Sequence, residues 1–389
     1  MATPTIVEGT CEKQFSGVKE RFEAHLRDGR EIGAAVAATM HGRMVVDLWG
    51  GHMDRQQTRP WRPDTLVNLY STTKGITATC VQRLIDKKQL SPDQRVAHYW
   101  PEFSQNGKDE ITIRQLLCHQ AGLPAISMPL APESVFDWET MTDALAAQKP
   151  WWPPGTRHGY HARTFGWLLG ELVRRVTGKT VGAYFSDEIA RPLGLDFHIG
   201  LASGQHHRVA PITKVPAPPP GAKPNLADIF MNQPDALTTK AFTNPNIYRL
   251  GDVANSAEWR SAEIPSSNGH GTARDLARLY GALACGGSVD GIHILSPERI
   301  EEMAIDQARG DDAVLLTETR FCMGFMKSVP GASMGPNDNA FGHPGTGGSV
   351  GFADPETGVG FGYVMNKCGA SILIDERPAA LMNALYKAL

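Results

Sequence analysis

The sequence predicts an α+β fold in which one antiparallel sheet is flanked by helices and joined to a mainly helical lobe. Near the start, residues 34–49 have the pattern of two apolar strands around the turn His41-Gly42-Arg43. From Ser71 to about residue 290 the pattern is mostly helical. Strands return near the end, at residues 322–329, 348–354 and 358–366. Because strands occupy both ends of the chain, we expect the two ends to share one sheet.

The length of the chain favours two lobes. A chain of 389 residues is large for a single core. We expect residues 1–70 and 290–389 to form a discontinuous sheet domain and residues 71–289 to form the mainly helical lobe. Pockets often lie where two such units meet, so an active site is expected at the junction.

Individual helices follow from apolar periodicity. An i, i+3, i+4, i+7 stripe runs from Phe165 to Val176 and stops at Gly178, which is typical of a helix with a glycine cap. Other helices are expected at residues 12–29 and 112–117, after Gly271, and at the C-terminal end. Five prolines between residues 213 and 226 indicate an irregular loop.

Composition excludes several classes of function. The chain is 41% hydrophobic and 20% charged, with a net charge of −3, so no basic surface for nucleic acid is indicated. We find no signal-peptide pattern and no membrane-length apolar run. The six cysteines form no C-x-x-C pair, which favours free thiols in a reducing compartment, and we therefore expect a cytoplasmic protein. The 13 histidines show no metal-binding spacing, so we expect no metal site. We expect no organic cofactor either.

The segment Ser71-Thr72-Thr73-Lys74 is the strongest chemical signal. A lysine three positions after a serine lies one turn away on the same helix face, so its amine sits beside the hydroxyl. Desolvation lowers the pKa of such a lysine and lets it share in proton transfer. The same S-x-x-K pattern marks the nucleophile of serine β-lactamases and penicillin-binding proteins.

Two alternatives weaken the motif when it is taken alone. Ser16-Gly17-Val18-Lys19 is a second S-x-x-K match, but it lies in a polar amphipathic segment, where Lys19 is expected on the surface. Ser71 instead follows an apolar, strand-like run and opens an apolar helix. Its structural alternative is a helix cap without catalytic function.

Tyr160 is the candidate third proton-handling group. It lies in a Gly/Pro-rich turn just before the striped helix, 89 positions after Ser71, and such turns present side chains into clefts. A cationic lysine nearby would favour its phenolate form. Loop packing is the structural alternative for Tyr160, and Tyr184, in a Y-x-S pattern, is expected to pack within a helix.

A glycine-rich segment from Gly342 to Gly351 is the candidate oxyanion side. Glycines let the backbone approach a ligand closely, so an N–H here would complete an oxyanion hole beside Ser71. The segment also contains Gly347-Gly348-Ser349-Val350-Gly351, a G-x-S-x-G match. That pattern marks a nucleophile only between a strand and a helix, and here strand and turn residues follow, so Ser349 is not the expected nucleophile.

In this order the motifs resemble the class C β-lactamase-like serine hydrolases, and most closely their family VIII carboxylesterase branch. The resemblance covers Leu66–Gly75, Ile113–Leu123, Pro154–Gly178 and Gly342–Asp354. It implies the β-lactamase/penicillin-binding-protein-like fold, with an antiparallel sheet flanked by helices plus a helical lobe. It also implies roles for individual residues: Ser71 as nucleophile, Tyr160 with Lys74 as general base and later acid, and the N–H groups of Ser71 and Thr346 as oxyanion hole.

Two departures from the family pattern concern substrate binding. His343-Pro344-Gly345 stands where the family has K-T-G, so a mostly neutral imidazole replaces a permanent cation. Ala162 stands at the third position of the family's Y-x-N and offers no amide. Each lost hydrogen bond to a charged group is worth about 1.5–3 kcal/mol. An uncharged small-molecule ester therefore fits His343 and Gly345 better than a β-lactam carboxylate.

The sequence thus predicts an esterase that works through an acyl-serine intermediate. An acyltransferase using the same intermediate and a weak β-lactamase or D-amino-acid peptidase are the enzymatic alternatives. A catalytically idle binding protein on the same fold is the non-enzymatic one. The sequence indicates neither the natural ester nor the oligomeric state.

Overall fold

The computed structural model describes residues 7–216 and 226–389. Its centre is a nine-stranded sheet with the order β1-β3-β2-β13-β12-β11-β10-β9-β8, in which all neighbouring strands are antiparallel. Its strands are β1 (Val7–Cys11), β2 (Gly33–Met40), β3 (Arg43–Gly51), β8 (Ala308–Asp311), β9 (Glu318–Phe321), β10 (Met326–Lys327), β11 (Phe341–Pro344), β12 (Val350–Asp354) and β13 (Val359–Met365). The predicted fold class is confirmed, because both ends of the chain build this sheet.

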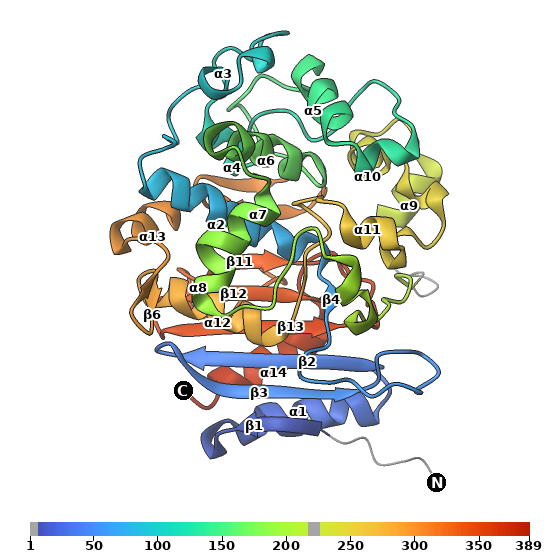
Figure 1. Ribbon diagram of the computed structural model, residues 1–389, viewed down its shortest axis with the longest axis vertical. Coiled ribbons are helices and arrows are strands. Elements are labelled where there is room, and N and C mark those ends of the chain that lie inside the picture. The colour runs from blue at the N-terminus through green and yellow to red at the C-terminus, as the bar shows by residue number, and fades with distance from the viewer. Residues whose placement is uncertain (1–6, 217–225) are drawn as a thin grey trace.

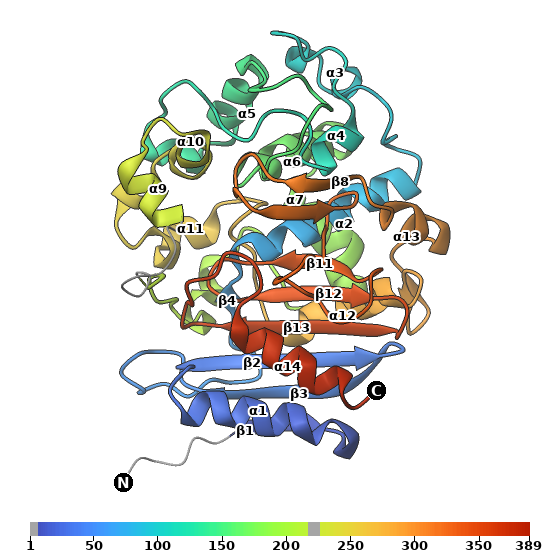
Figure 2. The ribbon, with the colours of Figure 1, turned by 180° about the vertical axis from the view of Figure 1, so that it is seen from behind.

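Helices cover both faces of the sheet and fill the lobe beyond its β11 side (Figures 1 and 2). The helices that bear on the sheet or on the site are α1 (Ser16–Arg27), α2 (Thr73–Asp86), α6 (Thr164–Thr177), α12 (Ala273–Ala284) and α14 (Glu376–Tyr386). The others are α3 (Val96–Tyr99), α4 (Ile113–Leu117), α5 (Trp138–Ala147), α7 (Val181–Phe185), α8 (Arg191–Leu193), α9 (Leu226–Asn232), α10 (Leu237–Thr243), α11 (Ala257–Ser261) and α13 (Pro297–Met303). The two short sheets pair β4 (Val67–Asn68) with β5 (His270–Gly271) and β6 (Ser288–Val289) with β7 (Ile292–His293).

The sheet lies between two helical layers. Figure 1 shows α12 in front of the sheet, and Figure 2 shows α1 and α14 packed together on the opposite face. α12 packs directly on β13, where a Cβ on Gly360 would lie 2.2 Å from the backbone nitrogen of Gly281. Real Cβ contacts are never that short, so glycine at position 360 permits the close approach of helix and strand.

Most predicted elements are present. The helix at residues 12–29, the hairpin around His41-Gly42 and the strands at 348–354 and 358–366 are confirmed within a few residues. The strand predicted at 322–329 is present only as β10, at residues 326–327, because the chain turns between β9 and β10. There Gly324 has a φ of +94° and the Cys322 N–H donates to the Phe325 carbonyl (3.0 Å). Such a turn is hard to predict from the sequence, because the residues around it are buried and no polar residue marks its position.

The domain boundaries at residues 70 and 289 stay a prediction. Within 71–289, α12 packs on the sheet, although most of that range forms the lobe. The Pro-rich loop predicted at 213–226 falls largely on residues 217–225, which lie outside the described residues. In the described parts of the chain, no helix combines the length and the apolar character needed to cross a membrane.

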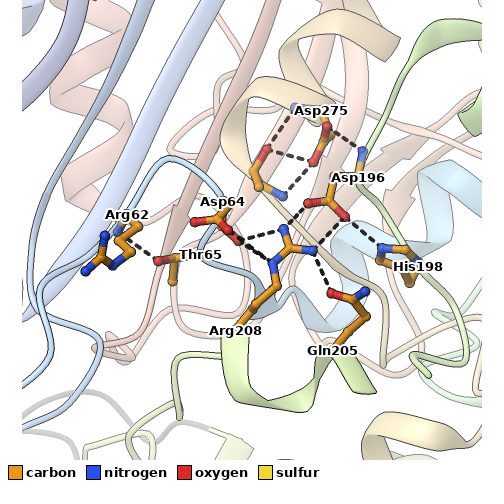
Figure 3. A network of polar contacts seen from close by, with 9 residues as sticks. Arg62, Asp64, Thr65, Asp196, His198, Gln205, Arg208 and Asp275 are labelled. Atoms are coloured by element: carbon orange, nitrogen blue, oxygen red, sulfur yellow. Dashed lines mark hydrogen bonds and ion pairs between the residues drawn. The ribbon is translucent and has the colours of Figure 1, made fainter. Parts of the chain in front are cut away.

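A polar network fixes the segment that leads to Ser71 (Figure 3). The Arg208 guanidinium donates to the Asp64 carbonyl (2.8 Å) and pairs with the Asp196 carboxylate. Asp196 also contacts His198 Nε2 (2.8 Å), and its N–H donates to the Asp275 carboxylate on α12 (2.9 Å). The network therefore ties the entry to β4, a loop of the lobe and a helix of the sheet layer into one support.

Candidate active site

Ser71 lies at a sharp transition from strand to helix. The chain passes from β4 into a 3-10 turn at Tyr70–Thr72 and then into α2. Tyr70 has a φ of +44°, a left-handed conformation that costs a side-chain-bearing residue of order 1 kcal/mol or more. Ser71 is half-buried, whereas Thr72 and Thr73 after it are buried. The serine thus follows a strained residue and is the partly exposed residue at an otherwise buried helix start.

Lys74 is enclosed directly beneath this hydroxyl. Its side chain is completely buried, and Nζ lies 3.1 Å from Ser71 Oγ. Nζ also donates to the carbonyls of Ala162 (2.7 Å) and Ser266 (3.0 Å). Burial lowers the pKa of Lys74 well below its usual range, and the positive charge of Arg163 lowers it further.

Tyr160 lies beside Lys74 and close to Ser71. Its ring centroid is 4.7 Å from Lys74 Nζ, and its hydroxyl is near enough to Ser71 for the two to affect the pKa of the phenol. Its backbone N–H donates to both carboxylate oxygens of Asp312 (3.0 and 3.1 Å), and its ring packs on His119 (5.1 Å between centroids). Burial raises the pKa of Tyr160, the nearby Ser71 hydroxyl opposes that rise and the charge of Asp312 adds to it.

The glycine-rich segment passes beside Ser71 after β11. A Cβ on Gly345 would lie 2.3 Å from the Leu69 carbonyl oxygen, so only glycine permits this approach. The Gly345 N–H is already used, because it donates to the Ser349 carbonyl (2.7 Å). Thr346 is half-buried, and within residues 7–216 and 226–389 its N–H has no hydrogen-bond partner. Of Gly345 and Thr346, therefore, only Thr346 has a backbone N–H left to donate to an oxyanion.

His343 and Ser349 are both enclosed. The His343 Nδ1–H donates to the Pro344 carbonyl (2.7 Å), and burial lowers the pKa of His343 to about 3. The imidazole is therefore neutral, as the comparison with K-T-G predicts. Ser349 Oγ donates to the Leu69 carbonyl (2.9 Å) and is 1% exposed. It braces the turn before Ser71 and is closed to substrate.

A buried ion cluster holds the far side of the glycine-rich turn. Arg377, at the start of α14, donates to the Gly347 carbonyl (2.7 Å). It also pairs with Glu31 (2.9 Å) and Asp375 (2.7 Å), and all three side chains are at most 7% exposed. Burial raises the pKa of Glu31 to about 7, against the lowering effect of Arg377. The cluster anchors the residue next to Thr346 to the sheet and to the last helix.

The other sequence candidates lie elsewhere. Ser16 and Lys19 are exposed on α1, where Lys19 pairs with Glu23 (3.9 Å), and Tyr184 is buried in α7. The described residues contain no group of three or more potential metal ligands. Ser266, Asp312 and Arg163 contact the site without any sequence signal, because their position depends on segments far from Ser71 in the chain.

The fold and this cluster together define a class. An antiparallel sheet, a helical lobe and a Ser-x-x-Lys pair whose buried lysine lies beside a tyrosine are the features expected of the β-lactamase-like serine hydrolases. A comparison with protein families supports the assignment: residues 18–380 match the Beta-lactamase family model. This chain belongs to the Beta-lactamase family.

Similar proteins include two that are named as esterases and one named as a penicillin-binding-protein homologue. The chain is 37% identical over 386 residues to esterase/beta-lactamase LipL of Mycobacterium tuberculosis, covering 95% of this chain and 85% of that protein. A family VIII carboxylesterase structure superposes with a TM-score of 0.90 at 40% identity, covering 99% of this chain and 100% of that one. A penicillin-binding-protein homologue from Caulobacter crescentus superposes with a TM-score of 0.91 at 43% identity, with the same coverage.

Proposed function

We propose that this chain is a carboxylesterase that cleaves small-molecule esters through an acyl-Ser71 intermediate. The observation that carries the proposal is the set of neighbours around Lys74 Nζ. Two of them are carbonyl oxygens, and the third is Ser71 Oγ. A neutral amine has two N–H donors and one lone pair, so it can satisfy both carbonyls and still accept the serine proton. The lowered pKa of Lys74 supports this neutral form.

Lys74 is therefore our choice for the base in the first step. The sequence favoured a Tyr160 phenolate, but burial raises the pKa of Tyr160 and so favours its neutral hydroxyl. Lys74 takes the proton as Ser71 Oγ attacks the ester carbonyl, and the N–H groups of Ser71 and Thr346 hold the oxyanion. The Tyr160 hydroxyl gives its proton to the departing alcohol and recovers one from Lys74. Water then attacks the acyl-serine with the same groups in reverse.

A pair of serine variants tests the proposal. Ser71→Ala should abolish hydrolysis of 4-nitrophenyl esters and labelling by a fluorophosphonate probe. Ser349→Ala is the matched control, because Ser349 is buried but has no access to substrate, and this variant should still be labelled. If Ser71→Ala remains active, or if folded Ser349→Ala alone loses labelling, the assignment is wrong.

A second candidate activity is weak β-lactam hydrolysis. It is supported by the name of the esterase/beta-lactamase relative. Opposing it, Ala162 offers no amide and His343 no positive charge for a β-lactam carboxylate. Assays with nitrocefin beside an ester chain-length panel compare the rates of β-lactam and ester hydrolysis, and added alcohol acceptors detect acyl transfer.

A cytoplasmic location is also part of the proposal, supported by six free cysteines.

A further inference from the structure

We propose that Arg163 forms an anion-binding subsite beside Ser71 and that the preferred esters carry a carboxylate. This inference rests on the proposed esterase function and specifies its substrate class. It changes the expectation of an uncharged ester, because it supplies a cation at a place other than the lost K-T-G lysine.

Arg163 is a buried cation without an acidic partner. It is 7% exposed, its Nη1 donates to the Pro245 carbonyl (2.6 Å), and its Cζ lies 5.6 Å from the centre of the Tyr248 ring. Within residues 7–216 and 226–389 no Asp or Glu oxygen lies within 4.0 Å of its guanidinium. Residues 1–6 and 217–225 contain no Asp or Glu at all. No side chain of this protein therefore neutralises the charge.

The other buried arginines show how unusual this is. Among the described residues, three further arginines are as buried as Arg163, at 4–6% exposure: Arg299, Arg320 and Arg377. Each has a carboxylate within 2.9 Å. Because an unpaired buried charge is costly, proteins pair such groups or keep them for a ligand. Arg163 also precedes α6, whose positive N-terminal end disfavours a cation and favours an anion.

Arg163 is next in the chain to a residue that contacts the reacting groups. It follows Ala162, whose carbonyl accepts from Lys74, and its own carbonyl accepts from Ser266 Oγ (2.8 Å). Its charge lowers the pKa of Lys74 and, as a smaller cause, that of Tyr70, the residue before the nucleophile. Tyr248, whose ring centre lies 5.6 Å from the Arg163 Cζ, is 58% exposed, so the ring beside the guanidinium borders solvent. A carboxylate bound at Arg163 would thus lie on the side of the site where Ala162 meets Lys74.

Matched pairs of esters test the subsite. The first pair is 4-nitrophenyl hydrogen glutarate and its methyl ester, with the charge on the acyl side. The second is 4-acetoxybenzoate and its methyl ester, with the charge on the alcohol side. In the wild type, kcat/KM for the charged ester should exceed that for the neutral one in at least one pair. Arg163→Gln should lower this charged-to-neutral ratio at least tenfold, whereas Arg163→Lys should keep most of it.

Arg157→Gln is the control, because it removes one positive charge from an exposed position outside the site. The charged-to-neutral ratio of kcat/KM in this variant should equal that of the wild type. A wild-type ratio at or below one in both pairs, or an unchanged ratio in Arg163→Gln, overturns the inference. Should Arg163→Gln fail to fold, the wild type alone decides: glutarate should compete with a neutral ester and glutaramide should not.

The same assays separate this inference from the proposed function. Turnover of neutral esters without any preference for charge refutes the subsite and leaves the esterase in place. Failure to cleave any ester, together with no fluorophosphonate labelling of the wild type, refutes the esterase and with it the subsite.

Discussion

Arg377→Met should destabilise the protein through the carboxylates it leaves behind. Arg377 is 4% exposed and pairs with Glu31 and Asp375, and the Glu31 side chain is 0% exposed. Breaking such a buried pair from one side costs about 3–5 kcal/mol. Unfolding entropy of about 2.1 cal/mol/K per residue amounts to about 0.8 kcal/mol/K for 389 residues. The midpoint of thermal unfolding should therefore fall by about 4–6 °C, measured by circular dichroism at pH 8.

A double variant identifies the cause of that loss. If the uncompensated Glu31 charge is responsible, adding Glu31→Gln to Arg377→Met should recover at least about 1 kcal/mol, whereas independent sites would add their losses. Two results would refute the reasoning: a midpoint within 1 °C of the wild type for Arg377→Met, or purely additive losses in the double variant.

Arg377→Met should also lower kcat more than it changes KM, because Arg377 holds the Gly347 carbonyl beside Thr346.

Three further outcomes follow from individual contacts. Gly345→Ala places a Cβ 2.3 Å from the Leu69 carbonyl oxygen, so the turn that carries Thr346 must shift. The kcat for ester hydrolysis should therefore fall at least about tenfold, and a kcat equal to that of the wild type would contradict this. Because only neutral Lys74 accepts a proton, kcat/KM should rise with pH and level off well below 10.5, and a rise that continues above 10.5 would exclude this role. Burial alone would raise the pKa of Asp196, but hydrogen bonds from its two basic partners lower it to about 2. This carboxylate should thus stabilise the fold above about pH 4 and lose that effect toward pH 2. Since its side chain is 38% exposed, Asp196→Asn should remove less than about 1 kcal/mol of pH-dependent stability in urea titrations.

Local spacing explains how much of the site was predictable. Ser71 and Lys74 are three residues apart on one helical turn, so their proximity follows from the motif alone. The strands and amphipathic helices were likewise visible because their periodicity is local. The roles of Arg163 and Asp312 could not be predicted in this way. Nothing near Arg163 in the chain shows that its guanidinium lacks a carboxylate partner, and nothing near Asp312 shows that its carboxylate accepts from the Tyr160 backbone N–H. The turn at Gly324 was missed because every residue around it is buried.

The pairing of β2 has a consequence for synthesis of the chain on the ribosome. In the finished sheet β2 is held between β3 and β13, and these partners lie at opposite ends of the sequence. The β2–β3 hairpin is complete by residue 51, whereas β13 ends at residue 365. At about 5–20 residues per second, the nascent chain must carry one open, apolar strand edge for about 15–60 s. Shielding of that edge by the emerging helical lobe or by a chaperone is thus a requirement for efficient folding of this protein.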